Sequence, residues 1–148
     1  GYLLQGIGAK FKSKFLALLL TSTTFGLLHI ANPEVQKLGM VIMVYYIGTG
    51  LFLGIITLMD EGLELALGFH AANNLVTALL VTSNWTAFQT NSLFKDFSEP
   101  NPLRDIFIPV LLFFPLLLLI FSKKYGWKNW KDKLLGTVEK PIELKEEY

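Results

Sequence analysis

Four apolar segments constrain the fold of this chain more than any other feature of its sequence. They run from Phe15 to Ala31, from Leu38 to Met59, from Leu63 to Thr82 and from Ile106 to Phe121. A helix needs about 20 mostly apolar residues to cross the hydrocarbon core of a bilayer. Because backbone groups in that core must be bonded internally, an isolated apolar segment crosses as a helix. We therefore expect an all-α, polytopic membrane helical bundle with about four transmembrane helices.

Polar breaks separate these segments. Asn32-Pro33-Glu34 is typical of a turn that ends the first helix, and Asp60-Glu61-Gly62 separates the second from the third. The stretch from Asn84 to Asp105 is predicted to be one long loop. Pro109 and Pro115 lie inside the fourth segment, where we expect them to kink the helix rather than end it.

Lysines cluster before the first segment and after the fourth. They are Lys10, Lys12 and Lys14 on one side and Lys123, Lys124, Lys128, Lys131 and Lys133 on the other. An even number of spans puts both clusters on one side of the membrane, and the lysine excess predicts that this side is cytoplasmic. Tyr125, Trp127 and Trp130 are typical of an interfacial anchor. We expect a membrane bundle over residues 1–121 and a basic, aromatic cytoplasmic tail over residues 122–148.

The composition narrows the range of functions. Hydrophobic residues make up 52% of the chain, charged residues make up 17%, and the net charge is +1. No basic face indicates nucleic acid as a partner, so membrane lipid is the partner that the composition predicts. Cysteine is absent, which excludes disulfides, thiolate zinc sites and cysteine nucleophiles within this sequence.

Both histidines of the chain lie inside apolar segments. Phe25 precedes His29 by four residues, and Asn74 follows His70 by four, with Asn73 beside it. Ionisable side chains in hydrocarbon are costly and usually mark a functional site. On a helix, His70 and Asn74 share one face, and Asn73 lies near it. Two imidazoles and an amide supply proton transfer and oxyanion stabilisation, but a water nucleophile also needs an activating carboxylate.

Other interpretations of these residues stay open. A histidine or an asparagine in a membrane helix often bonds only to a neighbouring helix, and Phe25 is expected to pack against His29. Zinc is an alternative cofactor, although two histidines without an HExxH helix make an incomplete site. Glu61 lies at a helix boundary and Glu64 on the far side of a helix from His70. We therefore expect no cofactor and no metal ligand.

The ordered motifs resemble those of the CPBP family of intramembrane proteases, which includes CAAX prenyl endopeptidases and the bacteriocin-processing and immunity proteins of the Abi group. That family carries EExxxR, then FxxxH, then HxxxN or HxxxD. Phe25 to His29 matches the second motif and His70 to Asn74 the third, whereas the first motif is missing. The opening Gly1-Tyr2-Leu3-Leu4 is similar to the residues that follow the motif's arginine.

The resemblance implies an eight-helix bundle, of which this chain would form the second half. It implies that a glutamate of the first motif activates water, assisted by His29, His70 and Asn74, with Phe25 and Asn73 in support. We therefore expect a fragment of a glutamic intramembrane endopeptidase that is inactive alone. Its substrate would be a peptide or protein, lipidated in some family members, and its location a bacterial plasma membrane. The alternatives are a bacteriocin-immunity or scaffold protein of the same fold and a zinc-dependent membrane protease.

Overall fold

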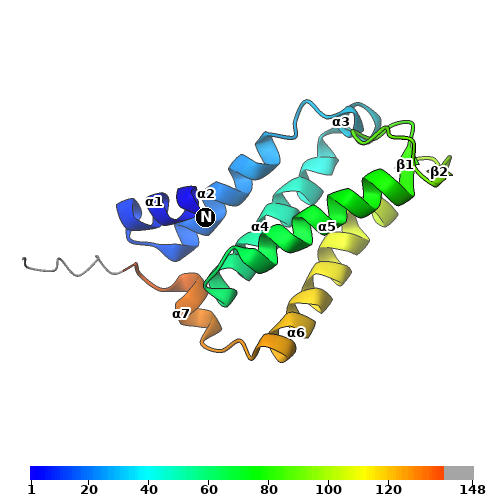
Figure 1. Ribbon diagram of the computed structural model, residues 1–148. Helices are drawn as coiled ribbons and strands as arrows, with labels where there is room; N and C mark the ends of the chain where they lie inside the picture. The colour runs from blue at the N-terminus through cyan, green and yellow to red at the C-terminus, as the bar shows by residue number, and fades with distance from the viewer. Residues whose placement is uncertain (139–148) are drawn as a thin grey trace, which may run out of the picture.

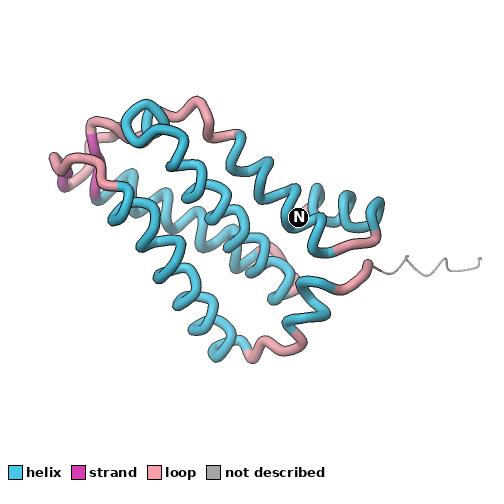
Figure 2. Tube along the Cα trace, turned by 180° about the vertical axis from the view of Figure 1, so that it is seen from behind, coloured by secondary structure: helices cyan, strands magenta, loops and turns pink. Residues whose placement is uncertain are grey.

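The computed structural model describes residues 1–138, and it is a mostly helical bundle (Figure 1). Its helices are α1 (Tyr2–Phe11), α2 (Lys14–Leu27), α3 (Pro33–Leu38), α4 (Met43–Asp60), α5 (Glu64–Leu80), α6 (Phe114–Tyr125) and α7 (Trp130–Leu135). A 3₁₀ turn, Gly39–Ile42, joins α3 to α4, and two π-helical turns, Leu103–Phe107 and Pro109–Phe113, lead into α6. Helices α2, α4, α5 and α6 run lengthwise, α1 folds back beside α2, and α7 closes one end, as the view from behind also shows (Figure 2).

Within residues 1–138, two helices are long and apolar enough to cross a membrane. One spans Pro33–Asp60 and the other Leu103–Tyr125, with 28 and 23 residues. Only 6% of the most apolar part of the second is buried, so its apolar side chains face outward, as they would toward lipid. Helices α2 and α5 have 14 and 17 residues, so the expected count of four spans is not confirmed.

The first predicted segment ends early because His29 interrupts the helical bonding pattern. Its backbone N–H donates to the carbonyl of Gly26 at 2.9 Å instead of continuing to Phe25. The His29 ring takes the Phe25 carbonyl instead, with Nδ1 at 2.7 Å from it. Helix α2 therefore ends at Leu27, and His29 lies in the turn that follows it.

The seam between α2 and α4 is built on glycines. A Cβ on Gly50 would lie 2.9 Å from both the Cα and the carbonyl oxygen of Ser22, and one on Gly26 would lie 3.1 Å from the backbone nitrogen of Ile47. A Cβ on Gly54 would meet the Leu18 side chain. Small residues let membrane helices approach closely. Gly50 and Gly54, four residues apart on α4, thus let α2 and α4 pack closely inside the bundle.

The prolines of the fourth segment widen the helix. A proline ring collides with the carbonyl four residues earlier in an α-helix. In the two π-helical turns the bonds reach five residues back, from the N–H of Ile108 to Leu103 and from that of Phe114 to Pro109. The expected proline distortion is therefore present, as π-helical turns before and around Pro109.

The long loop contains structure that the sequence pattern did not predict. Strand β1 (Val81–Ser83) continues from α5 and pairs in parallel with β2 (Phe94–Asp96). A side-chain bond closes the loop onto α3, because the N–H of Ala87 donates to Oε1 of Glu34 at 2.8 Å. The otherwise all-α bundle therefore carries a small two-stranded pair at one end.

Residues after the fourth segment return to the bundle. Helix α6 continues past Phe121 to Tyr125, and Trp127 is buried at 8% exposure against the core of α4 and α5. Its indole N–H donates to Asp60 at 3.2 Å, and Lys133 of α7 donates to the Met59 carbonyl at 2.9 Å. Trp127 is thus a core residue rather than an exposed anchor. Residues 139–148 of the expected tail lie outside the described residues.

Candidate active site

His29 is held on three sides at the end of α2. Its ring lies 4.7 Å from the ring of Phe25 and stacks on Tyr46 of α4, with centroids 4.7 Å apart at 25°. Its Nδ1 lies 2.7 Å from the Phe25 carbonyl. A carbonyl oxygen only accepts, so Nδ1 must carry the ring proton. In the neutral ring, Nε2 is therefore the nitrogen that can accept a hydrogen bond.

His70 and Asn74 meet on one face of α5, as their spacing predicts. The Asn74 side-chain nitrogen lies 3.3 Å from Nε2 of His70. An amide NH₂ group donates, so Nε2 accepts and the ring proton of His70 belongs on Nδ1. The two histidines thus present opposite functions, an acceptor at His29 and a donor at His70.

Phe25 joins the two motifs in space. Its ring lies 4.7 Å from the ring of His29 and 5.8 Å, edge to face, from that of His70. The expected packing of Phe25 against His29 is present, and the same side chain also reaches α5. Both motifs are thereby brought to one region of the bundle.

Asn73 is placed differently from the other predicted site residues. It is exposed, and within residues 1–138 its recorded bond is the one that its backbone carbonyl accepts from Thr77. Its side chain forms no hydrogen bond with His70 among the described residues, although a residue three positions along a helix lies near the same face.

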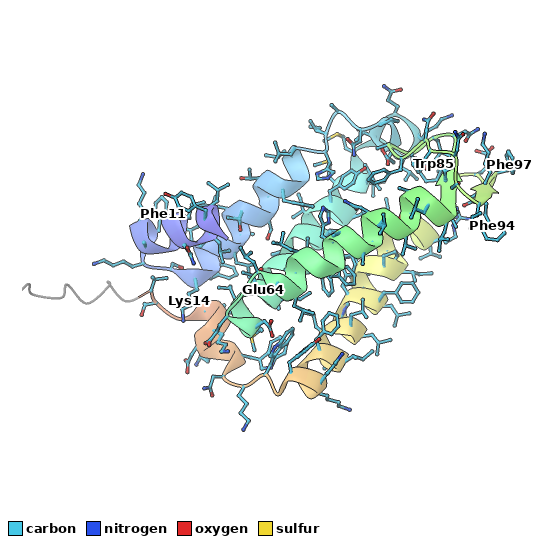
Figure 3. The ribbon with its side chains drawn as sticks, in the orientation of Figure 1. Phe11, Lys14, Glu64, Trp85, Phe94 and Phe97 are labelled. Carbon is cyan, nitrogen blue, oxygen red and sulfur yellow. The ribbon has the colours of Figure 1, made fainter. Side chains whose placement is uncertain are left out.

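An apolar cavity of about 300 Å³ opens beside Phe25 and His70. Its other lining residues are mostly small or apolar and come from α1, α2, α4 and α5; they include Leu4, Thr21, Leu28, Gly50, Leu53 and Leu67. A second cavity of about 390 Å³, near Lys14 and Glu64 in Figure 3, shares Leu4, Thr57 and Leu63 with it. The two cavities therefore adjoin, one beside His70 and the other at a charged end of the bundle.

Glu61 and Glu64, the two glutamates considered as metal ligands, line the second cavity rather than the one beside Phe25 and His70. Residues 1–138 contain no group of three or more histidine, aspartate, glutamate or cysteine side chains placed to hold a metal ion. Glu61 instead pairs with Lys133 at 3.2 Å, and Glu64 lies at the charged cavity.

Three residues beside His29 escaped prediction from the sequence. The Asn32 side chain donates to the Tyr46 hydroxyl at 3.2 Å, and the Glu34 carboxylate lies close to that hydroxyl. Asn32 and Glu34 were interpreted as parts of a turn, and Tyr46 as part of the second apolar segment. Tyr46 could have been noticed as a phenol within an apolar segment. The sequence does not reveal, however, which histidine its ring contacts.

Comparisons with known proteins cover both histidine motifs. The family model described as type II CAAX prenyl endopeptidase Rce1-like matches residues 1–76, which include His29, His70 and Asn74. The chain is 29% identical over 126 residues to the uncharacterized protein YyaK of Bacillus subtilis (strain 168). That alignment covers 84% of this chain and 42% of YyaK, so the chain spans less than half the length of this relative.

No solved structure matches the chain significantly. The family match covers slightly more than half of the sequence, and two long apolar helices accompany it. The chain is therefore a membrane protein that belongs to the Rce1-like family of type II CAAX prenyl endopeptidases, a protease family.

Proposed function

We propose that this chain carries the histidine half of the active site of an intramembrane endopeptidase that hydrolyses peptide bonds with an activated water. The observation that carries the proposal is the pairing of His29 and His70 around Phe25, beside a cavity that could admit a peptide. The family match extends over both motifs and supports the same reaction.

Both rings carry their proton on Nδ1, but each offers a different nitrogen to the reaction, Nε2 in His29 and Nδ1 in His70. His29, with its proton on Nδ1, can accept a proton or a hydrogen bond at Nε2. His70, with Nε2 engaged by Asn74, can donate from Nδ1 to the substrate carbonyl as negative charge develops on its oxygen. Asn74 keeps the His70 ring in that tautomer. In this scheme water adds to the carbonyl carbon, its proton passes to a base, and the leaving amine takes a proton as the C–N bond breaks.

The base for water is the missing member. We propose that a carboxylate from outside residues 1–148, corresponding to the family's first-motif glutamate, supplies it, and that the chain alone is inactive. Glu34, the carboxylate that the described residues bring near His29, accepts instead from the N–H of Ala87 and lies by the Tyr46 hydroxyl, which supports this. We further propose a peptide or lipidated peptide as the substrate, and a plasma-membrane location with Lys10–Lys14 and residues 122–148 in the cytoplasm.

The test is cleavage of two fluorogenic peptides in detergent micelles, one with a farnesylated cysteine three residues from its carboxyl end and one without the lipid. The chain itself is compared with the complete product of its gene. We expect cleavage only by the complete product, and a loss of about 10²–10⁴-fold in kcat/KM for His29→Ala and His70→Ala. Asn74→Ala should lose about 10²-fold or more. Gly68→Ala is the control, because no atom lies within 4 Å of an added methyl there.

Three results would count against this proposal. Full activity of the complete product after His29→Ala or His70→Ala would refute the catalytic assignment. Cleavage by the chain alone, abolished by His70→Ala, would refute an external carboxylate. If the complete product cleaves neither peptide nor any casein-derived peptide, a non-enzymatic membrane protein of the same fold, in an immunity or scaffold role, becomes the better explanation.

A further inference from the structure

The ring of His29 contacts two aromatic rings in addition to its hydrogen-bonding partner. Phe25 lies on one side of it and Tyr46 on the other, each with ring centroids 4.7 Å from those of His29. Tyr46 is nearly parallel to the imidazole, at 25°, and is only 7% exposed. Two ring contacts and the hydrogen bond at Nδ1 thus hold the imidazole, and Nε2 is the nitrogen that these contacts do not use.

Tyr46 is itself fixed by the turn that follows α2. Its hydroxyl accepts a bond from Asn32 at 3.2 Å, so its own proton remains to be donated. The Glu34 carboxylate lies close to that hydroxyl, and its buried Oε2 has no hydrogen-bond partner among the described residues. A buried carboxylate oxygen is costly without a donor, so this oxygen is an unsatisfied acceptor near the Tyr46 phenol.

Glu34 also reaches the other half of the site. Its Oε1 accepts from the N–H of Ala87, in the loop that follows α5, the helix with His70 and Asn74. This contact lies at the bundle end where Trp85 is labelled in Figure 3. The first turn of α3 and the loop after α5 are thereby joined at one glutamate.

From these contacts we propose that Tyr46, held in place by Asn32, is a positioning residue that keeps the His29 imidazole in the orientation and tautomer described above. Its part in catalysis rests on the proposed function, whereas its effect on the His29 ring does not. Preorganised rings matter because a displacement of about 1 Å at a reacting group can cost about 10²-fold in rate.

The experiment uses the chain labelled with ¹⁵N only in histidine rings. Because the sequence has two histidines, the NMR spectrum in micelles contains two ring systems. Wild type should show His29 protonated at Nδ1. Tyr46→Leu should move the His29 nitrogens toward a mixture of tautomers and remove the ring-current shift of its carbon-bound protons. Tyr46→Phe and Asn32→Ala should move them in the same direction by less, since the ring remains but its hydroxyl contact is lost.

Tyr45→Leu is the matched control, because Tyr45 is the same residue type and is adjacent to Tyr46. Its ring contacts the rings of Tyr46 and Phe114 rather than that of His29. The His70 signals are an internal control and should stay unchanged in every variant. Unchanged His29 signals in Tyr46→Leu, or an equal change in Tyr45→Leu, would overturn the proposal. If Tyr46→Leu does not fold, Asn32→Ala decides, and unchanged His29 signals in it overturn the proposal.

An activity measurement separates this inference from the proposed function. In the complete gene product, Tyr46→Leu should lower kcat by about 10–100-fold with little change in KM. If wild type has no peptidase activity while the His29 signals respond as expected, the proposed function fails and the positioning role stands. If the wild type cleaves the peptide, and Tyr46→Leu changes neither kcat nor the His29 signals, the positioning role is refuted while the proposed function stands.

Discussion

Replacement of Gly50 by alanine tests whether the α2–α4 seam sets the geometry of the site. The new Cβ would lie 2.9 Å from the Cα and the carbonyl oxygen of Ser22 and 3.3 Å from the Cβ of Phe25, while ordinary contacts begin near 3.4 Å. The two nearest atoms are backbone, so α2 must move by roughly 0.5 Å or more. Such overpacking costs about 1–3 kcal/mol.

Alanine also stabilises a helix by about 1 kcal/mol relative to glycine, and this gain partly offsets the cost of overpacking. Gly68→Ala in α5 has the same propensity gain and no atom within 4 Å of the added methyl. The propensity gain therefore cancels in the comparison, and Gly50→Ala should be less stable than Gly68→Ala by about 1–3 kcal/mol. Gly54→Ala should fall between them, because its methyl meets the flexible end of Leu18 rather than backbone.

The assay is reversible unfolding by dodecyl sulfate in dodecyl maltoside micelles, followed by tryptophan fluorescence. The histidine spectrum is a second readout, since α2 carries Phe25 and leads into His29, and α4 carries Tyr46. We expect the His29 signals to move in Gly50→Ala and to stay in Gly68→Ala. Equal stability of the two variants, with unchanged His29 signals in both, would refute the seam as the determinant of site geometry.

Two further expectations concern the ends of the bundle. Lys133→Ala should lower the free energy of unfolding by about 1.5–3 kcal/mol, because a charged donor to the Met59 carbonyl at the end of α4 is lost. Lys131 is exposed, so Lys131→Ala should change the free energy of unfolding little. Equal effects of the two variants would contradict the role given to Lys133. The N–H of Ser98 donates to Asp96 and lowers the pKa of that carboxyl below its usual range. Its stabilisation should therefore be present above the usual aspartate pKa and be lost as the pH falls through the lowered one. Ser98→Ala removes the hydroxyl but keeps the N–H, so it should return the Asp96 pKa only part of the way to its usual value. Carbon NMR of the Asp96 carboxyl measures this pKa, and a usual aspartate value in the wild type would contradict the expectation.

The apolar segments predicted the main helices, because hydrophobic length and period are local properties of the chain. They did not predict that α2 would end before His29, since that end depends on an imidazole taking the carbonyl of Phe25. The partners of Glu34 were also beyond reach, because Ala87 lies 53 residues away and meets it only once the loop has folded. The burial of Trp127 had the same cause, a contact with Asp60 from a distant helix.

The spacing from Phe25 to His29 has a physical meaning that the motif alone does not express. Four residues is the distance at which a side chain can take the carbonyl that the helix would otherwise use, so the backbone of residue 25 fixes the imidazole tautomer whatever its side chain. The phenyl ring has a separate role, because it contacts both histidines and lines the cavity beside His70. A smaller apolar residue at this position would keep the first function and lose the second. The phenylalanine of this motif is therefore best explained as the contact between two helices, and the spacing as the cap that orients the histidine.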